Sequence, residues 1–161
     1  MLNFLKSALG LHRSSPADDA PASDDQGTPA GDNLMQYPTG AARFAEAAKK
    51  ARATLPRFFE LARAGLSGTY LVKMRLAGGG EVEHLWVEVT GMRNGRFQGR
   101  LANDPVVPGY RAGDSVDIAQ DEIEDWMINT GAARFGGYTV RAMLDEMPAA
   151  QAAELRRQLR D

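Results

Sequence analysis

Residues 81–89 alternate between two chemically different sets of side chains, and this alternation constrains the fold more than any other feature of the chain. Because successive side chains of a strand point to opposite faces of a sheet, the pattern predicts a strand with one aliphatic face and one polar, aromatic face. The aliphatic face is expected to pack on a core, so the other face is the first place to look for a site. The two faces carry Leu85, Val87 and Val89 on one side and Val82, His84, Trp86 and Glu88 on the other.

A hairpin is expected to join this strand to the strand before it, because three consecutive glycines separate the two. If the loop comprises residues 77–80, Val72 lies opposite Leu85, and the aliphatic faces of the two strands match. The same register places Lys73 opposite His84 on the other face.

A third strand is expected after an asparagine–glycine pair, which is typical of hairpin turns. A two-residue loop would place Val89 opposite Arg100. A three-residue loop with Gly95 in the left-handed conformation places Val89 opposite Gly99 and Glu88 opposite Arg100, and it matches the apolar faces better. The second face is then either covered by other elements, which would bury its tryptophan, or open for binding, and it carries Lys73, His84, Trp86, Glu88, Gln98 and Arg100.

The remaining elements surround this meander. Apolar spacing predicts a helix over residues 41–53 and a second helix ending at Ala64, and a short strand is expected over residues 114–118. Helices are expected over residues 139–147 and 148–160. We therefore predict an α+β domain with N-terminal helices packed on a curved antiparallel sheet of four to five strands, or on a partly closed small barrel, followed by C-terminal helices.

The first 38 residues differ from the rest in composition. Residues 1–13 form a short amphipathic segment, in which Lys6 limits any apolar run to five residues, too few for a signal sequence or a membrane span. Docking on the domain or a partner, weak contact with a membrane surface through residues 1–11, and disorder are all open for this segment. Residues 14–38 are predicted to be a disordered acidic linker, and residues 39–161 a single domain.

The composition excludes several classes of function. The chain has no cysteine and two histidines, which rules out disulfides, thiolate chemistry and a multi-histidine zinc site, and it fits a cytoplasmic location. The net charge is −2, and the first 38 residues account for −3 of it, with two cations against five aspartates. The domain is therefore close to neutral, and a nucleic-acid partner is not expected. Residues 43–63 are locally basic and residues 114–125 are acidic, which we interpret as solvated faces or as neighbours in the fold.

Two groups of residues suggest proton transfer or metal binding, and both have simpler explanations. His84 and Glu88 share a strand face with Lys73 and could form a base with an orienting carboxylate, but a lone strand histidine is more often a packed or surface residue. The six carboxylates in residues 114–125 lack the alternation of a calcium-binding loop. We expect no metal and no cofactor.

A glycine pair before a helix suggests anion binding. Gly136 and Gly137 precede Tyr138, and Arg141 lies close in sequence, so backbone amides and a guanidinium could meet an anion. Glycines in this position more often only allow the chain to turn. Trp126, like the tryptophan of the central strand, is more typical of a core than of a ligand platform.

Short motifs follow one another in order over about residues 44 to 145. They are Glu83-His84-Leu85-Trp86-Val87-Glu88-Val89, Gly99-x-Leu101-x-Asn103-Asp104-Pro105, Gly113-Asp114-x-Val116, Ile123-x-Asp125-Trp126-Met127 and Gly136-Gly137-Tyr138-Thr139-x-Arg141. This ordered series resembles the YegJ-like bacterial family, domain of unknown function 2314. The resemblance implies a small bacterial domain and brings no reaction with it. It singles out His84, Trp86, Asn103, Asp104, Asp125, Trp126, Tyr138 and Arg141.

These observations favour a non-enzymatic module that binds an unidentified protein partner through the His84/Trp86 face. The alternative is a small enzyme that uses His84 with Glu88, or an anion-binding protein that uses the glycine turn with Arg141. A pocket with His84 at its floor would favour the enzyme, and a flat exposed face would favour the module. No residue is predicted to be catalytic, and the candidate binding residues are Lys73, His84, Trp86, Glu88, Arg100, Trp126, Tyr138 and Arg141.

Overall fold

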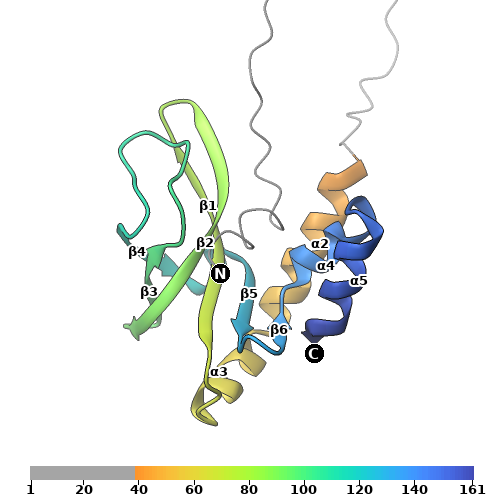
Figure 1. Cartoon of the computed structure of the whole chain (residues 1–161). Helices are drawn as coiled ribbons and strands as arrows, with labels where there is room; N and C mark the ends of the chain where they lie inside the picture. Colours follow the sequence, from red (N-terminus) through yellow and green to blue (C-terminus); the bar gives the residue numbers. More distant parts are fainter. Residues whose placement is uncertain (1–38) are drawn as a thin grey trace, which may run out of the picture.

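The computed structural model describes residues 39–161 (Figure 1). The predicted amphipathic segment and acidic linker lie outside these residues. The helices are α2 (Thr39–Ala53), α3 (Leu55–Arg63), α4 (Tyr138–Met143) and α5 (Ala149–Gln158), with short 3-10 turns η1 (Gln120–Glu122) and η2 (Leu144–Glu146). The strands are β1 (Thr69–Gly78), β2 (Glu81–Arg93), β3 (Arg96–Leu101), β4 (Ser115–Ala119), β5 (Ile123–Asn129), β6 (Arg134–Gly136) and β7 (Leu159–Arg160).

The predicted α+β class is confirmed, but the sheet is larger than expected and is not a barrel. Seven strands form one open sheet in the order β4-β3-β2-β1-β5-β6-β7, and β6 pairs with β7 in parallel, so the sheet is mixed. The unexpected strands β6 and β7 have three and two residues. Strands this short carry no alternation that a sequence pattern could reveal.

The predicted register between β1 and β2 is wrong by two residues. Gly78 pairs with Glu81, so the hairpin loop has only two residues, Gly79 and Gly80, both with positive φ. Lys73 consequently lies opposite Trp86, and His84 lies opposite Arg75. A shift of two residues keeps every side chain on its predicted face, so matching the apolar faces could not distinguish the two registers.

The predicted register between β2 and β3 is confirmed, although the loop is shorter than expected. Val89 pairs with Gly99, Glu88 with Arg100, and Gly95 has a φ of +75°. The turn itself has two residues, since Arg93 pairs with Arg96, and the extra residue is a bulge at Thr90. The bulge adds one residue to β2, as a third loop residue would have done. The pairing beyond the bulge therefore agrees with the prediction, although the loop has only two residues.

One core lies between the sheet and the N-terminal helices. The indole Nε1 of Trp126 donates to the carbonyl oxygen of Ala51 at 3.1 Å and to Oγ1 of Thr54 at 3.0 Å, which ties β5 to the junction of α2 and α3. Phe58 packs edge-on against the rings of Trp126 and Phe97. The aliphatic face of β2 joins this cluster, as the alternation predicted, through Leu85 and Val87 with Val72, Leu76, Leu101, Ile118, Ile123 and Ile128.

A second core covers part of the opposite face, so Trp86 is not on an open surface. Trp86 is 2% exposed and packs in one cluster with Leu71, Met127, Val140, Leu144, Ala152, Leu155 and Leu159. The C-terminal helices therefore cover Trp86, which is one of the two alternatives that the sequence allowed for this face. Figure 1 shows α2, α4 and α5 gathered beside β5 and β6, while β1 to β4 extend away from them. Within residues 39–161, no helix is both long enough and apolar enough to cross a membrane.

Candidate functional site

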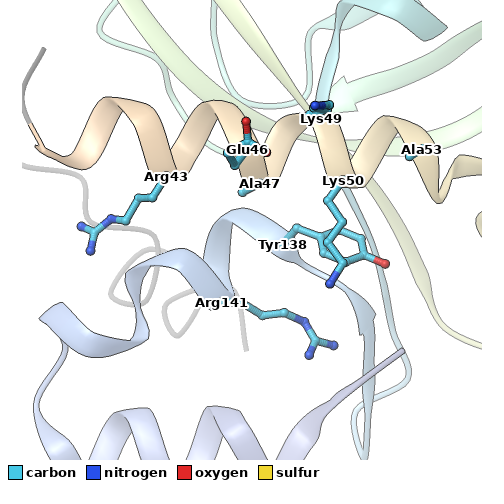
Figure 2. A pocket seen from close by; sticks show the side chains of 8 residues that line it. All are labelled: Arg43, Glu46, Ala47, Lys49, Lys50, Ala53, Tyr138 and Arg141. Carbon is cyan, nitrogen blue, oxygen red and sulfur yellow. The ribbon is translucent and has the colours of Figure 1, made fainter.

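An open groove of about 520 Å³ lies between α2 and α4, and we call it the α2–α4 groove. Figure 2 shows Arg43 and Lys50 extending from α2 toward α4, which presents Tyr138 and Arg141. The volume lies within the range typical of ligand sites. Its lining residues are Arg43, Glu46, Ala47, Lys49, Lys50, Ala53, Tyr138 and Arg141.

The helical period places four of the lining residues of α2 together. Arg43, Glu46, Ala47 and Lys50 follow one another at intervals of three, one and three residues, so they share one side of the helix. Ala47 is buried, and its small side chain lets the helix approach its neighbours. On α4, Tyr138 and Arg141 are three residues apart and likewise share one side.

One buried carboxylate fixes the position of α4. Asp125 is fully buried on β5, and its Oδ1 accepts the backbone N–H groups of Trp126 at 2.8 Å and Tyr138 at 3.0 Å. Its Oδ2 accepts the N–H of Thr139 at 2.7 Å and the hydroxyl of Thr139 at 2.6 Å. Burial raises the pKa of Asp125, and these four hydrogen bonds to the charged form oppose that shift.

The glycine turn allows the chain to turn before α4, which was the simpler of the two explanations that the sequence offered for it. A Cβ on Gly136 would lie 2.4 Å from the carbonyl oxygen of Trp126, and Gly137 adopts a left-handed conformation before α4. The N–H groups of Tyr138 and Thr139, which were candidates for an external anion, already donate to Asp125. The turn therefore receives a carboxylate of its own chain.

The ring of Tyr138 lies between two cations. The Nζ of Lys50 is 5.4 Å from the centre of the ring, and the guanidinium carbon of Arg141 is 5.8 Å from it. Arg141 is held in place, since its Nε donates to the carbonyl oxygen of Gly136 at 3.2 Å and its Nη2 to that of Arg160 at 2.7 Å. A cation over an aromatic face is stabilised by the ring quadrupole, so the ring helps to keep positive charge at this place.

The groove has more positive than negative charge. Four cations and one carboxylate line it, while Arg43 forms an ion pair with Glu146 and Arg141 forms one with Asp161. Lys49 and Lys50 are exposed and have no carboxylate at ion-pair distance within residues 39–161. The two lysines can therefore meet an added anion without first losing a carboxylate partner in this part of the chain.

His84 has a carboxylate partner, but it is not the predicted one. The side chain of His84 is about half exposed, and its Nδ1 lies 2.6 Å from Oε2 of Glu124. Glu124 stands at an irregularity in β5, where Lys73 pairs with Asp125 and the next residue of β1 pairs with Ile123. Glu88 remains exposed four residues further along β2, opposite Arg100.

The other predicted residues divide between the core and the sheet surface. Trp126 is fully buried, and the Nζ of Lys73 lies 6.0 Å from the centre of the Trp86 ring. Burial lowers the pKa of Lys73, while the charges of Asp125 and Glu124 raise it. The structure thus brings Lys73, Trp86 and His84 together on one face, but only His84 among them is exposed there.

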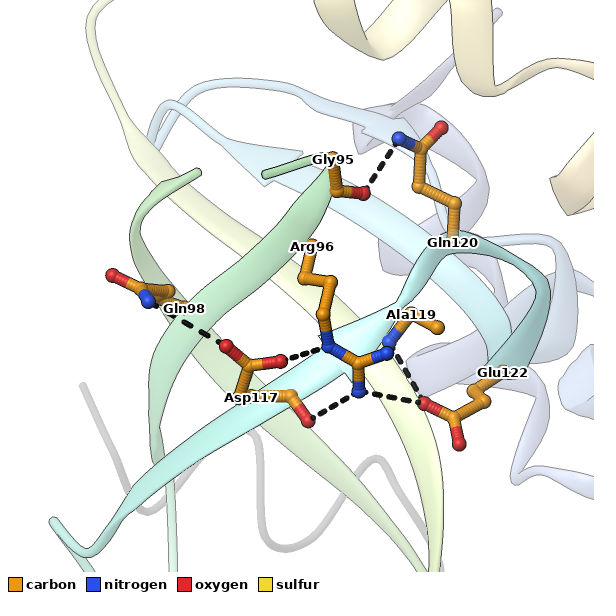
Figure 3. Close-up of polar contacts among 7 residues, drawn as sticks. All are labelled: Gly95, Arg96, Gln98, Asp117, Ala119, Gln120 and Glu122. Carbon is orange, nitrogen blue, oxygen red and sulfur yellow. Dashed lines mark hydrogen bonds and ion pairs between the residues drawn. The ribbon is translucent and has the colours of Figure 1, made fainter. Parts of the chain in front are cut away.

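The acidic run in residues 114–125 is distributed over separate contacts. Figure 3 shows Arg96 bridging Asp117 and Glu122 at the β3–β4 edge. The hydrogen bond from Arg96 lowers the pKa of Asp117. Among the described residues, no group of three or more histidine, cysteine or acidic side chains could hold a metal ion. The remaining contacts of this run are Asp114 with the N–H of Arg111, Glu124 with His84, and Asp125 with α4.

Two of the groove residues, Tyr138 and Arg141, were predicted from the sequence as binding residues. The groove residues on α2 were not predicted. The signal was available as the locally basic composition of residues 43–63, where Arg43, Lys49 and Lys50 lie. Composition alone could not show which helix would face them, because the contact joins residues about ninety positions apart in the sequence.

Comparisons with known proteins identify the family. The model of the family described as "Uncharacterized protein conserved in bacteria (DUF2314)" matches residues 41–159, which is longer than the stretch recognised from the motifs. The chain is 34% identical over 115 residues to the uncharacterised protein YegJ of Escherichia coli K12, covering 71% of this chain and 75% of that protein.

A shorter similarity links the chain to a second protein. It is 31% identical over 77 residues to a protein of Neisseria meningitidis serogroup B that carries an ankyrin-repeat name, which covers 47% of this chain and 30% of that protein. No solved structure matches the chain. The family match and the YegJ similarity together show that this chain belongs to the DUF2314 family of uncharacterised bacterial proteins.

Proposed function

We propose that this domain is a non-enzymatic module that binds an acidic segment of a protein partner in the α2–α4 groove. The observation that carries the proposal is the excess of positive charge among the residues that line an open groove, two of which are exposed lysines with no ion-pair partner within residues 39–161. A cytoplasmic location, with which the absence of cysteine is compatible, belongs to the same proposal.

The spacing of the cations supports an extended ligand rather than a single small anion. Arg43 and Lys50 are seven residues apart on α2, which corresponds to about 10.5 Å along the helix. A single carboxylate or phosphate would contact both cations only if the two long side chains bent toward one point, whereas an extended ligand can meet each of them separately. On a peptide in the polyproline II conformation, carboxylates three residues apart lie on one side and about 9 Å apart, and they would match it.

The groove is a better candidate than the His84/Trp86 face. Trp86 lies in the core and cannot contact a partner without unfolding of the C-terminal cover, and His84 already has Glu124 as its partner. His84, Glu88 and Arg100 stay exposed, so this face can still contribute polar contacts. A buried aromatic anchor, which commonly dominates the energy of an interface, is not available on it.

A second candidate function rests on the contact between His84 and Glu124. A carboxylate 2.6 Å from an exposed imidazole can orient it for proton transfer, which would support the enzyme alternative with Glu124 in the place predicted for Glu88. This candidate requires a substrate whose turnover is lost in a folded His84→Gln variant.

The principal experiment is a titration of a fluorescein-labelled peptide, with glutamate at every third position and serine between, with the full chain, followed by fluorescence anisotropy. We expect Lys49→Gln/Lys50→Gln to weaken binding about two- to thirtyfold, because each of the two exposed charges contributes roughly 0.2–1 kcal/mol. The matched control is Arg57→Gln/Arg63→Gln, which removes the same charge from the exposed side of α3. Equal weakening by both variants would show that only net charge matters and would defeat the proposal.

A further inference from the structure

The sequence immediately before α2 has the charge that the groove would bind. All five aspartates of the first 38 residues lie between positions 18 and 32, and the two cations of this region lie before position 14. Residues 14–33 contain no leucine, isoleucine, valine, methionine or aromatic side chain. A segment with this composition can interact by charge but has little apolar surface to bury.

The chain is long enough for this segment to reach the groove. Asp32 precedes the start of α2 by seven residues, which can span up to about 25 Å. Lys50 lies eleven residues after the start of α2, about 16.5 Å along the helix. Asp24 and Asp25 have still longer reach. Because the segment is covalently attached, its effective concentration at the groove is on the order of millimolar.

We infer that the acidic segment, residues 18–32, occupies the α2–α4 groove of its own chain and is displaced by the acidic partner. This inference rests on the proposed function and adds a regulation to it: the chain carries its own competitor. Individual exposed charge pairs are weak, so occupancy depends on several aspartates acting together and decreases with salt. The competition sets a threshold, since a partner must bind more tightly than the attached segment.

The test compares full chains that differ only in charge. The variant Asp24→Asn/Asp25→Asn/Asp32→Asn should bind the same labelled peptide about three- to tenfold more tightly than the unmodified chain, as expected for removal of a competitor at millimolar effective concentration. The control Glu60→Gln/Glu81→Gln/Asp121→Asn changes the net charge equally at exposed positions outside the groove. It should leave the affinity within about twofold, and the difference between variants should shrink in about 0.5 M salt.

A second measurement locates the segment directly. Carbodiimide treatment of the dilute full chain, followed by mass spectrometry, should join Lys49 or Lys50 to aspartates of residues 18–32 within one molecule. Equal peptide affinity of the aspartate variant and the unmodified chain, with no such crosslink, would overturn the inference while leaving the proposed function intact. If no form binds the peptide, the proposed function fails and the inference fails with it.

Discussion

The carboxylate of Asp125 accepts both the backbone N–H of Thr139, at 2.7 Å, and its hydroxyl, at 2.6 Å. Through this pair a residue of β5 determines where α4 begins, and hence where Tyr138 and Arg141 face α2. The shape of the groove therefore depends on a buried residue that does not line it.

Replacement of Asp125 by alanine should strongly destabilise the domain. The change removes the acceptor for four hydrogen bonds and leaves the buried donors of Trp126, Tyr138 and Thr139 without a partner. Each unsatisfied buried group costs about 1–3 kcal/mol, so we expect a loss of at least 3 kcal/mol in the free energy of unfolding. Urea denaturation measures it, and a loss below about 1 kcal/mol would show that α4 is held by other contacts.

The raised pKa of Asp125 predicts a pH dependence with a definite sign. A carboxyl group whose pKa is higher in the folded than in the unfolded state favours folding when protonated. Its contribution is present below its ordinary pKa of 3.8 and is lost as the pH rises through the folded-state value. The stability of the unmodified protein relative to Asp125→Asn should therefore decrease from pH 4 upward. An increase over that range would mean that the hydrogen bonds, and not burial, dominate the shift.

Gly136→Ala should cost more stability than the same change at Gly131. Both glycines have positive φ, but a Cβ at Gly136 would lie 2.4 Å from the carbonyl oxygen of Trp126, whereas nothing lies within 4 Å at Gly131. Backbone conformation alone costs about 1 kcal/mol, so Gly131→Ala provides that reference. Thermal unfolding should show an additional loss of about 2 kcal/mol or more at Gly136. Equal losses would mean that the turn can relax away from β5.

The two tryptophans should respond differently to replacement by phenylalanine. Both are buried, but the Nε1 of Trp126 donates two hydrogen bonds, while that of Trp86 has no partner in the described part of the chain. Trp126→Phe should therefore be more destabilising than Trp86→Phe by about 1–2 kcal/mol, since the lost volume is the same. Denaturant midpoints compare them, and the reverse order would contradict the two packing environments.

The sequence predicted the strands around β2 because the alternation of side chains along a strand determines which of them face the core. The two faces of β2 and the pairing of Glu88 with Arg100 follow from it. The predicted pairing of Lys73 with His84 was wrong. A glycine-rich loop allows registers that differ by two residues, and both registers keep each side chain on the same face. Matching the apolar faces excludes registers that are shifted by one residue, but it does not distinguish registers that are shifted by two.

The candidate site was less accessible to sequence reasoning because its contacts are long-range. The partner of His84 is forty residues away in sequence and reaches it through an irregularity in β5. The cover over Trp86 comes from helices near the end of the chain, whose packing partner no local pattern specifies. Tyr138 and Arg141 were named for a glycine turn, whereas their significance lies in the contact with α2.

The most direct test of the groove as a binding site is an NMR titration of the full chain with the unlabelled acidic peptide. We predict that the largest chemical-shift changes occur at Lys49, Lys50 and the Tyr138 ring, while His84 and Arg100 on the sheet face change little. The account would be contradicted if, at saturating peptide, the signals of His84 and Arg100 shifted and the groove signals did not. That result would indicate that the peptide binds the sheet face.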